Sequence, residues 1–181
     1  MRLLIISLAC CAALVPQTVM KVRRASGPTP ATCGQTSIGA GNDVGDTSYY
    51  ISGASCVPAS ASTVVDCQVY TGTVGGDVNC AVYDSDGAGG TPFTLVCQGT
   101  PTASVATSWN VVPMSGCGTL AGSHTYWITV NNNNSSISYK TTFVGQSYYE
   151  FGHTCCTFGN FNATASSLGS VTYSFYLDTL R

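Results

Sequence analysis

Residues Thr63-Val64-Val65-Asp66-Cys67-Gln68-Val69-Tyr70 carry the pattern that indicates the fold class. Apolar and polar positions alternate along this segment, and successive side chains of a β-strand point to opposite faces of a sheet. The alternation therefore predicts a strand with one buried face. The set that we expect to face inward consists of Thr63, Val65, Cys67 and Val69.

The same alternation recurs along the chain, and turns rich in Gly, Asn and Ser separate the repeats. The other alternating segments are residues 78–82, 93–97, 109–112, 126–130, 137–143 and 171–177. Beyond the first 24 residues, no segment places apolar residues at helical spacing. Many short strands joined by polar turns predict an all-β, antiparallel β-sandwich of jelly-roll or Greek-key type.

Cysteine usage predicts the redox environment of this domain. A chain that is rich in cysteine and poor in lysine and arginine is typical of an oxidising compartment outside the cytosol. We therefore expect a disulfide-stapled domain. The cysteines expected to form its disulfides are Cys33, Cys56, Cys67, Cys80, Cys97, Cys117, Cys155 and Cys156.

One disulfide can be inferred from strand register. Cys80 and Cys97 lie at similar distances from the middle of the hairpin proposed around residues 84–92, and both are expected to face inward. We predict that they form a bond, which would stabilise the fold by about 3 kcal/mol in the chain-entropy picture. Cys56–Cys67 is a weaker candidate, and the remaining pairing stays open.

The N-terminus has the features of a secretory leader. Arg2 precedes an apolar run over residues 3–15, which is shorter than the ~20 residues of a transmembrane helix. Lys21-Val22-Arg23-Arg24 then forms either a processing site or a basic linker. We predict a signal peptide or leader over residues 1–24 and a single β-sandwich domain over residues 25–181. The alternative is that the leader stays attached as a buried strand or short helix.

Charge narrows the range of partners. Without residues 1–24, Lys140 and Arg181 are the only basic residues against eight acidic ones, which gives a net charge of −6. An acidic surface repels phosphate backbones and anionic lipids. We therefore expect an extracellular protein that does not bind nucleic acid and has no membrane span, with association at the cell surface as an alternative to free secretion.

Two parts of the chain resemble a known class of domain. Residues 78–84, followed by Gly89-Gly90-Thr91-Pro92 and Leu95, resemble a unit made of a strand, Tyr-Ser/Asp, Gly-Gly-x-Pro and Leu. Residues 109–113 and 120–130 resemble the two segments that follow this unit. The unit occurs in β-sandwich, jelly-roll-like accessory and adhesion domains of bacterial secreted and surface proteins. The resemblance covers roughly residues 47–143. It implies a β-sandwich with a non-catalytic accessory, adhesion or carbohydrate-associated role.

Metal binding is not favoured at either candidate motif. Asp84-Ser85-Asp86-Gly87 places alternate carboxylates in a glycine-containing turn, as in a short calcium loop, but it lacks the distal glutamate of an EF-hand. Such Asp-Gly turns are common between strands, so we favour a plain turn, with calcium at Asp84 and Asp86 as the alternative. His153-Thr154-Cys155-Cys156 could suggest zinc, but disulfides fit an oxidising compartment better. No other cofactor is predicted.

The sequence contains no recognisable catalytic motif. There is no G-x-S-x-G elbow, and neither His124 nor His153 lies in a recognisable triad context. A glycosidase pair would need Glu150 with an aspartate, or two aspartates such as Asp66 and Asp77. Nothing in the sequence selects such a pair, so we predict a protein that is not an enzyme.

Aromatic residues are the candidates for ligand contact. Aromatic faces can stack on sugar rings, and the alternative is that they pack within the two sheets. Our ligand-binding candidates are Trp127, Tyr148 and Tyr149, with Tyr49, Tyr50 and Tyr70 as weaker ones.

Sequons for N-glycosylation occur at three asparagines. Asn133, Asn134 and Asn162 each begin an N-x-S/T motif, which predicts surface loops if the host glycosylates them.

We therefore expect a secreted, non-catalytic β-sandwich that binds a surface polysaccharide or glycan, or serves in adhesion. The alternative is a structural subunit that packs with copies of itself in an extracellular fibre, a pilus-like polymer or a particle coat. A small secreted hydrolase is the least favoured of the three.

Overall fold

The computed structural model describes the chain from residue 27 onward, in several segments. These cover residues 27–44, 51–72, 76–134, 138–142, 148–151, 167–169 and 172–181. The predictions for the leader, His153, Cys155, Cys156 and Asn162 lie outside these residues.

The described residues form two antiparallel sheets, which confirms the predicted all-β sandwich class. Sheet A contains β1 (Pro30–Gly34), β2 (Gly41–Val44), β4 (Ser62–Thr71), β8 (Ser108–Ser115), β9 (Thr119–Leu120), β11 (Ser138–Thr142), β14 (Thr172–Tyr173) and β15 (Phe175–Leu180). Sheet B contains β3 (Ile51–Cys56), β5 (Asp77–Asp84), β6 (Leu95–Gly99), β7 (Thr102–Ala103), β10 (Tyr126–Asn132), β12 (Tyr148–Phe151) and β13 (Ser167–Gly169). The described helical structure is one 3-10 turn, η1 (Ala88–Gly90). Within these segments, therefore, no helix has the length and apolar character that a bilayer crossing needs.

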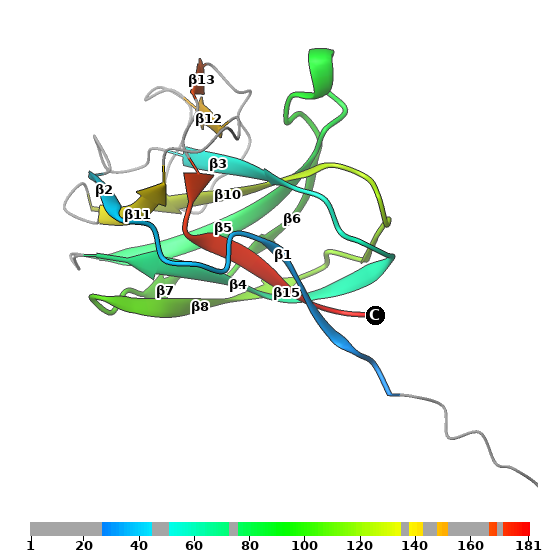
Figure 1. Cartoon of the computed structure of the whole chain (residues 1–181), viewed down its shortest axis with the longest axis horizontal. Coiled ribbons are helices and arrows are strands. Elements are labelled where there is room, and N and C mark those ends of the chain that lie inside the picture. The colour runs from blue at the N-terminus through cyan, green and yellow to red at the C-terminus, as the bar shows by residue number, and fades with distance from the viewer. Residues whose placement is uncertain are drawn as a thin grey trace, which may run out of the picture.

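The strand order closes the sandwich almost into a barrel. The main path runs β1-β15-β4-β8-β6-β5-β10-β3-β12-β13, and the two sheets meet where β6 pairs with β8. Near the other edge of sheet A, a disulfide joins β1 to β3. Figure 1 shows β1 beside β15, and η1 projecting from the body between β5 and β6.

Among the described residues, three disulfides connect sheet B to sheet A or to the loop between its strands β8 and β9. Cys33–Cys56 joins β1 to β3, Cys67–Cys80 joins β4 to β5, and Cys97–Cys117 joins β6 to the loop after β8. All six cysteines are buried in the same hydrophobic core. Because each bond links sheet B to sheet A or to the loop that joins two of its strands, the disulfides oppose separation of the two layers. Paired cysteines of this kind indicate an oxidising environment.

The predicted Cys80–Cys97 bond is wrong, and so is the weaker Cys56–Cys67 candidate. Cys97 lies opposite Val82 in the register of β5 and β6, so Cys80 and Cys97 are diagonal neighbours. A β-bulge between Val82 and Tyr83 shifts this register. Both cysteines do face inward as expected, but each finds its partner on the opposite sheet.

A second β-bulge alters the alternation in β4. Asp66 pairs with Asp178 and Val64 pairs with Thr179, so Val65 is the additional residue. As a result Val64 is buried and Val65 is 44% exposed. The expectation that Thr63 and Val65 face inward is wrong, because the bulge at Val65 changes which face the preceding side chains occupy. Ser62 and Val64 are buried instead.

The core lies between the sheets and is built mainly from alternate residues of both. Its largest side chains come from sheet A (Leu120, Tyr173, Phe175, Leu177) and sheet B (Tyr126, Ile128). Phe93 was expected in the inward set of the β6 segment, but it precedes the first residue of β6 and is 60% exposed. The antiparallel all-β architecture is the part of the family resemblance that the structure bears out.

Candidate functional site

Three adjacent strands of sheet A, in the order β15-β4-β8, present a row of polar and aromatic side chains away from the core. In their register Asp66 lies opposite Asp178, and Tyr70 lies opposite Trp109. We call this surface the sheet A face. Its residues are Asp66, Gln68, Tyr70, Trp109, Val111, Tyr176 and Asp178.

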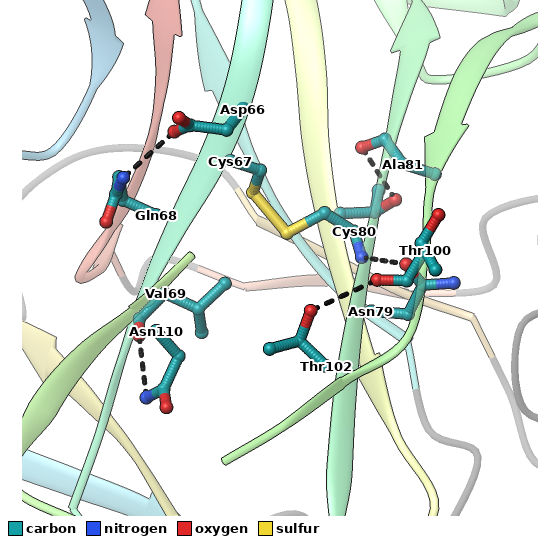
Figure 2. The surroundings of a disulfide bond; sticks show 11 residues. Asp66, Cys67, Gln68, Val69, Asn79, Cys80, Ala81, Thr100, Thr102 and Asn110 are labelled. Carbon is teal, nitrogen blue, oxygen red and sulfur yellow. Dashed lines mark hydrogen bonds between the residues drawn. A yellow bond between two sulfur atoms is a disulfide. The ribbon is translucent and has the colours of Figure 1, made fainter. Parts of the chain in front are cut away.

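The opposite side of β4 faces the core. Figure 2 shows Cys67 bonded to Cys80, while Asp66 and Gln68 lie on the other side of the β4 strand. The core disulfide and the sheet A face are therefore built from neighbouring residues of one strand, because side chains alternate along it.

An aromatic cluster occupies one end of the sheet A face. The rings of Tyr70 and Trp109 are 5.5 Å apart, and those of Trp109 and Tyr176 are 5.0 Å apart, with edge-to-face geometry in both pairs. Tyr70 is buried, whereas Trp109 and Tyr176 are partly exposed. Edge-to-face packing fixes the rings, so they form a rigid and partly exposed aromatic surface.

A pair of carboxyl groups lies beside these rings. The Gln68 side chain donates from Nε2 to Asp66 Oδ1 at 2.9 Å and to Asp178 Oδ2 at 3.3 Å. Burial raises the pKa of Asp178, and the charge of Asp66 and hydrogen bonding to it raise this pKa further. Burial also raises the pKa of the Tyr176 hydroxyl, with smaller contributions from the charges of Asp178 and Asp66.

No described basic side chain forms an ion pair with these two carboxyl groups. The ion pair found there joins His124 Nε2 to Asp84 Oδ1 at 2.7 Å, and it lies on sheet B and the loop before β10. Like charges directly opposite each other on neighbouring strands are unfavourable. The sheet A face therefore combines aromatic rings with acidic hydrogen-bond acceptors that have no cationic partner among these residues.

The predicted ligand-binding residues lie elsewhere. Trp127 lies in β10 and is only 5% exposed, and its indole Nε1 donates to Gly90 O at 3.0 Å. The exposure that we expected of Trp127 is wrong because neighbouring structure covers this side of sheet B. Tyr148 and Tyr149 lie in β12, and their side chains are outside the described part of the chain. Tyr70, a weaker candidate, does belong to the sheet A face.

The two aspartates of the proposed calcium loop bond to different protein groups. Asp84 pairs with His124, and Asp86 accepts hydrogen bonds from Thr94 N at 2.9 Å and Thr94 Oγ1 at 2.5 Å. These hydrogen bonds lower the pKa of Asp86. The described residues contain no group of three or more His, Cys, Asp or Glu side chains that could hold a metal ion. We therefore assign the loop to turn structure.

Two of the predicted glycosylation sites lie at the end of β10. Asn133 is half-buried, and its side chain accepts from Asp77 N at 2.8 Å and donates to Asp77 Oδ2 at 3.2 Å. Asn134 donates from its backbone N to Asn132 Oδ1 at 2.9 Å. These contacts show that Asn133 binds Asp77 and so fixes the end of β10. Glycosylation of Asn133 and Asn134 stays a prediction.

Sequence reasoning missed most of the sheet A face. Asp66 and Tyr70 were considered separately, whereas Gln68, Trp109, Tyr176 and Asp178 were not proposed for any site. The signal is present as i, i+2 spacing in three segments, Asp66-Gln68-Tyr70, Trp109-Val111 and Tyr176-Asp178. Only the strand order brings these segments side by side.

Comparison with protein-family models gave no match for this chain, and comparison with curated proteins gave no significant match either. Neither the resemblance to bacterial accessory and adhesion domains nor any other family is established by them. The functional inference therefore depends on the chemistry of the sheet A face.

Proposed function

We propose that this protein is a secreted, non-catalytic β-sandwich that binds polysaccharide on its sheet A face. The observation that carries the proposal is the position of the Tyr70–Trp109–Tyr176 cluster beside the Asp66–Gln68–Asp178 group on three adjacent strands. Trp127, our first candidate from the sequence, has no part in it.

Each half of this surface matches one part of a sugar. A pyranose has apolar C–H faces, which pack against aromatic rings, and hydroxyl groups at its rim, which donate well to carboxylates. Trp109 and Tyr176 supply partly exposed rings, and Asp66 and Asp178 supply acceptors next to them. Both components stand on strands rather than on loops, which keeps their geometry rigid.

The oxidising environment indicated by the disulfides supports the same proposal. Disulfides between the sheets indicate an oxidising environment, and extracellular polysaccharides are encountered there. Secretion through the predicted leader and association with a surface are parts of the proposal.

The test is retention on a panel of insoluble polysaccharides, including cellulose, chitin and xylan. We expect the native protein to be retained on at least one of them. Trp109→Ala and Tyr176→Ala should each lose about fivefold or more in affinity, because the loss of an aromatic stacking contact costs about 1 kcal/mol or more. Phe93→Ala is the matched control, because Phe93 is 60% exposed on the hairpin between β5 and β6 and lies off the sheet A face. Unchanged retention of both sheet A variants would overturn the proposal.

A structural subunit is the second candidate, and one observation favours it. β1 ends the main strand path and pairs with β15 on one side, without a further partner among the described strands. Such an edge can accept a strand from another molecule. Size-exclusion chromatography of the secreted protein separates the candidates, since a strict monomer contradicts the polymer. Release of soluble sugar during the retention assay would instead indicate the hydrolase.

A further inference from the structure

The two carboxyl groups of the sheet A face lie where a β-bulge changes the strand register. Asp66 and Asp178 are directly opposite in β4 and β15, and the register shifts immediately after Asp178. Bulges re-aim side chains next to the position where they interrupt the ladder. Here the regular register of residues 66–69 with residues 175–178 brings two like-charged side chains together, and the bulge at Val65 lies directly beside them.

Gln68 holds this pair from one side. Its Nε2 donates to a carboxyl oxygen of Asp66 and to one of Asp178, so a single amide group supports both. One amide offsets only part of the repulsion between two ionised carboxylates. A proton held between the two groups removes this repulsion, because only one of them is then charged.

The strands that flank the pair directly carry no basic residue, and β11, which pairs with β4 at Thr71, carries Tyr139 and Lys140. β8 and β1, which flank β4 and β15, carry no residue that titrates, apart from the disulfide-bonded Cys33 of β1. On β4 and β15 the other titratable groups are the hydroxyls of Tyr70 and Tyr176. Arg181 follows the end of β15, and among the described residues it forms no ion pair with either aspartate.

We propose that Asp66 and Asp178 share one proton in acid and release it to solvent as the pH rises, and that this release strengthens polysaccharide binding at the sheet A face. The inference rests on the proposed function of this face. With the proton in place, the carboxyl groups satisfy each other and Gln68. Once it has left, charged oxygen atoms become free to accept hydrogen bonds from sugar hydroxyls, and charge-assisted bonds are the stronger kind.

The pKa of Asp178 supports this reading. It is raised by burial first and by the charge of Asp66 second, while the hydrogen bond from Gln68 lowers it, so Asp66 favours the protonated form of Asp178. The pKa of the Tyr176 hydroxyl is raised by burial first and then by the charges of Asp178 and Asp66. The carboxyl pair therefore acts electrostatically on the aromatic cluster.

The first experiment measures affinity for a soluble oligosaccharide of the retained polysaccharide between pH 3.5 and 7.5. Native protein should bind more tightly as pH rises, by at most about tenfold per pH unit, the limit for one released proton. Asp178→Asn and Asp66→Asn each keep one unpaired carboxyl group, so their affinity should level off above about pH 5, whereas the affinity of native protein should continue to rise. Asp86→Asn is the matched control, because Asp86 lies in the hairpin near η1, away from the sheet A face. The pH profile of this variant should follow that of native protein.

The second experiment follows the side-chain carboxyl carbons of Asp66 and Asp178 by NMR in the native protein without ligand. Two coupled titration steps are expected, and independent titration of both groups at ordinary values would overturn the proton sharing. Binding that is equally tight at every pH would overturn the switch but leave the proposed function standing. Lack of binding at every pH would overturn the proposed function and the switch with it.

Discussion

The outer faces of the two sheets differ sharply although both are built from alternating strands. In β10, all seven residues from Tyr126 to Asn132 are buried, so both faces of that strand are covered. In β15, by contrast, Phe175, Leu177 and Thr179 are buried while Tyr176 and Asp178 remain partly exposed. Strand β10 of sheet B is therefore buried on both faces, whereas β15 of sheet A leaves its outer face partly open to solvent.

The two tryptophans show what this difference means for function. Trp127 lies on the covered face of sheet B and hydrogen-bonds to Gly90, whereas Trp109 lies on the sheet A face between two tyrosines and stays partly exposed. The same residue type thus stabilises the fold on one sheet and is available to a ligand on the other. Exposure, and not residue type, separates the two roles.

The largest effect that we expect is from Trp127→Ala. Removing a buried tryptophan should lower the free energy of unfolding by about 3–5 kcal/mol, because it costs both burial and a cavity. Urea unfolding followed by circular dichroism measures this loss. Trp109→Ala is the matched change on the open face and should cost clearly less stability. Equal losses in the two variants would remove the distinction between the faces.

The next largest effect concerns the disulfides between the sheets. Cys67→Ala/Cys80→Ala removes the bond between β4 and β5, and both sulfur-bearing residues are fully buried. The free energy of unfolding should fall by about 3 kcal/mol, with added packing losses. Cys97→Ala/Cys117→Ala should cost less, since the backbone pairing of β6 with β8 still joins that edge. A larger loss from the second pair would show that the β6–β8 edge depends on its disulfide.

The smallest effect is a pH dependence of stability that has opposite signs for two aspartates. One is Asp178 in sheet A, and the other is Asp86 in the hairpin between β5 and β6 of sheet B. The pKa of Asp178 is raised in the folded state, so its contribution to stability is present below the ordinary pKa and is lost as pH rises through the folded one. Asp178→Asn should therefore gain stability relative to native protein between pH 3.5 and 7.

The pKa of Asp86 is lowered, so its contribution is present above the ordinary pKa and is lost as pH falls. Asp86→Asn should lose stability over the same range, as measured by urea midpoints at each pH. Slopes of the same sign would contradict this assignment.

The sequence allowed the fold class and the oxidised state of six cysteines to be predicted, but only part of the site. Alternation identified β4, β5 and β10 as strands, and Cys67, Cys80 and Cys97 as inward-facing residues. Pairing of the cysteines failed because it was inferred within hairpins, whereas the bonds join opposite sheets. Trp127 was chosen because nothing in a sequence shows which outer face the rest of the chain covers.

Sequence alone determined that this chain forms short antiparallel strands with cysteines on their inner side, because alternation and cysteine content are local properties. Tertiary structure decided which cysteines meet, that Asp66 lies opposite Asp178, and that Tyr70, Trp109 and Tyr176 form one cluster. The physical reason is the strand order: residues about 40 and 110 positions apart become neighbours only when β8 and β15 pair with β4.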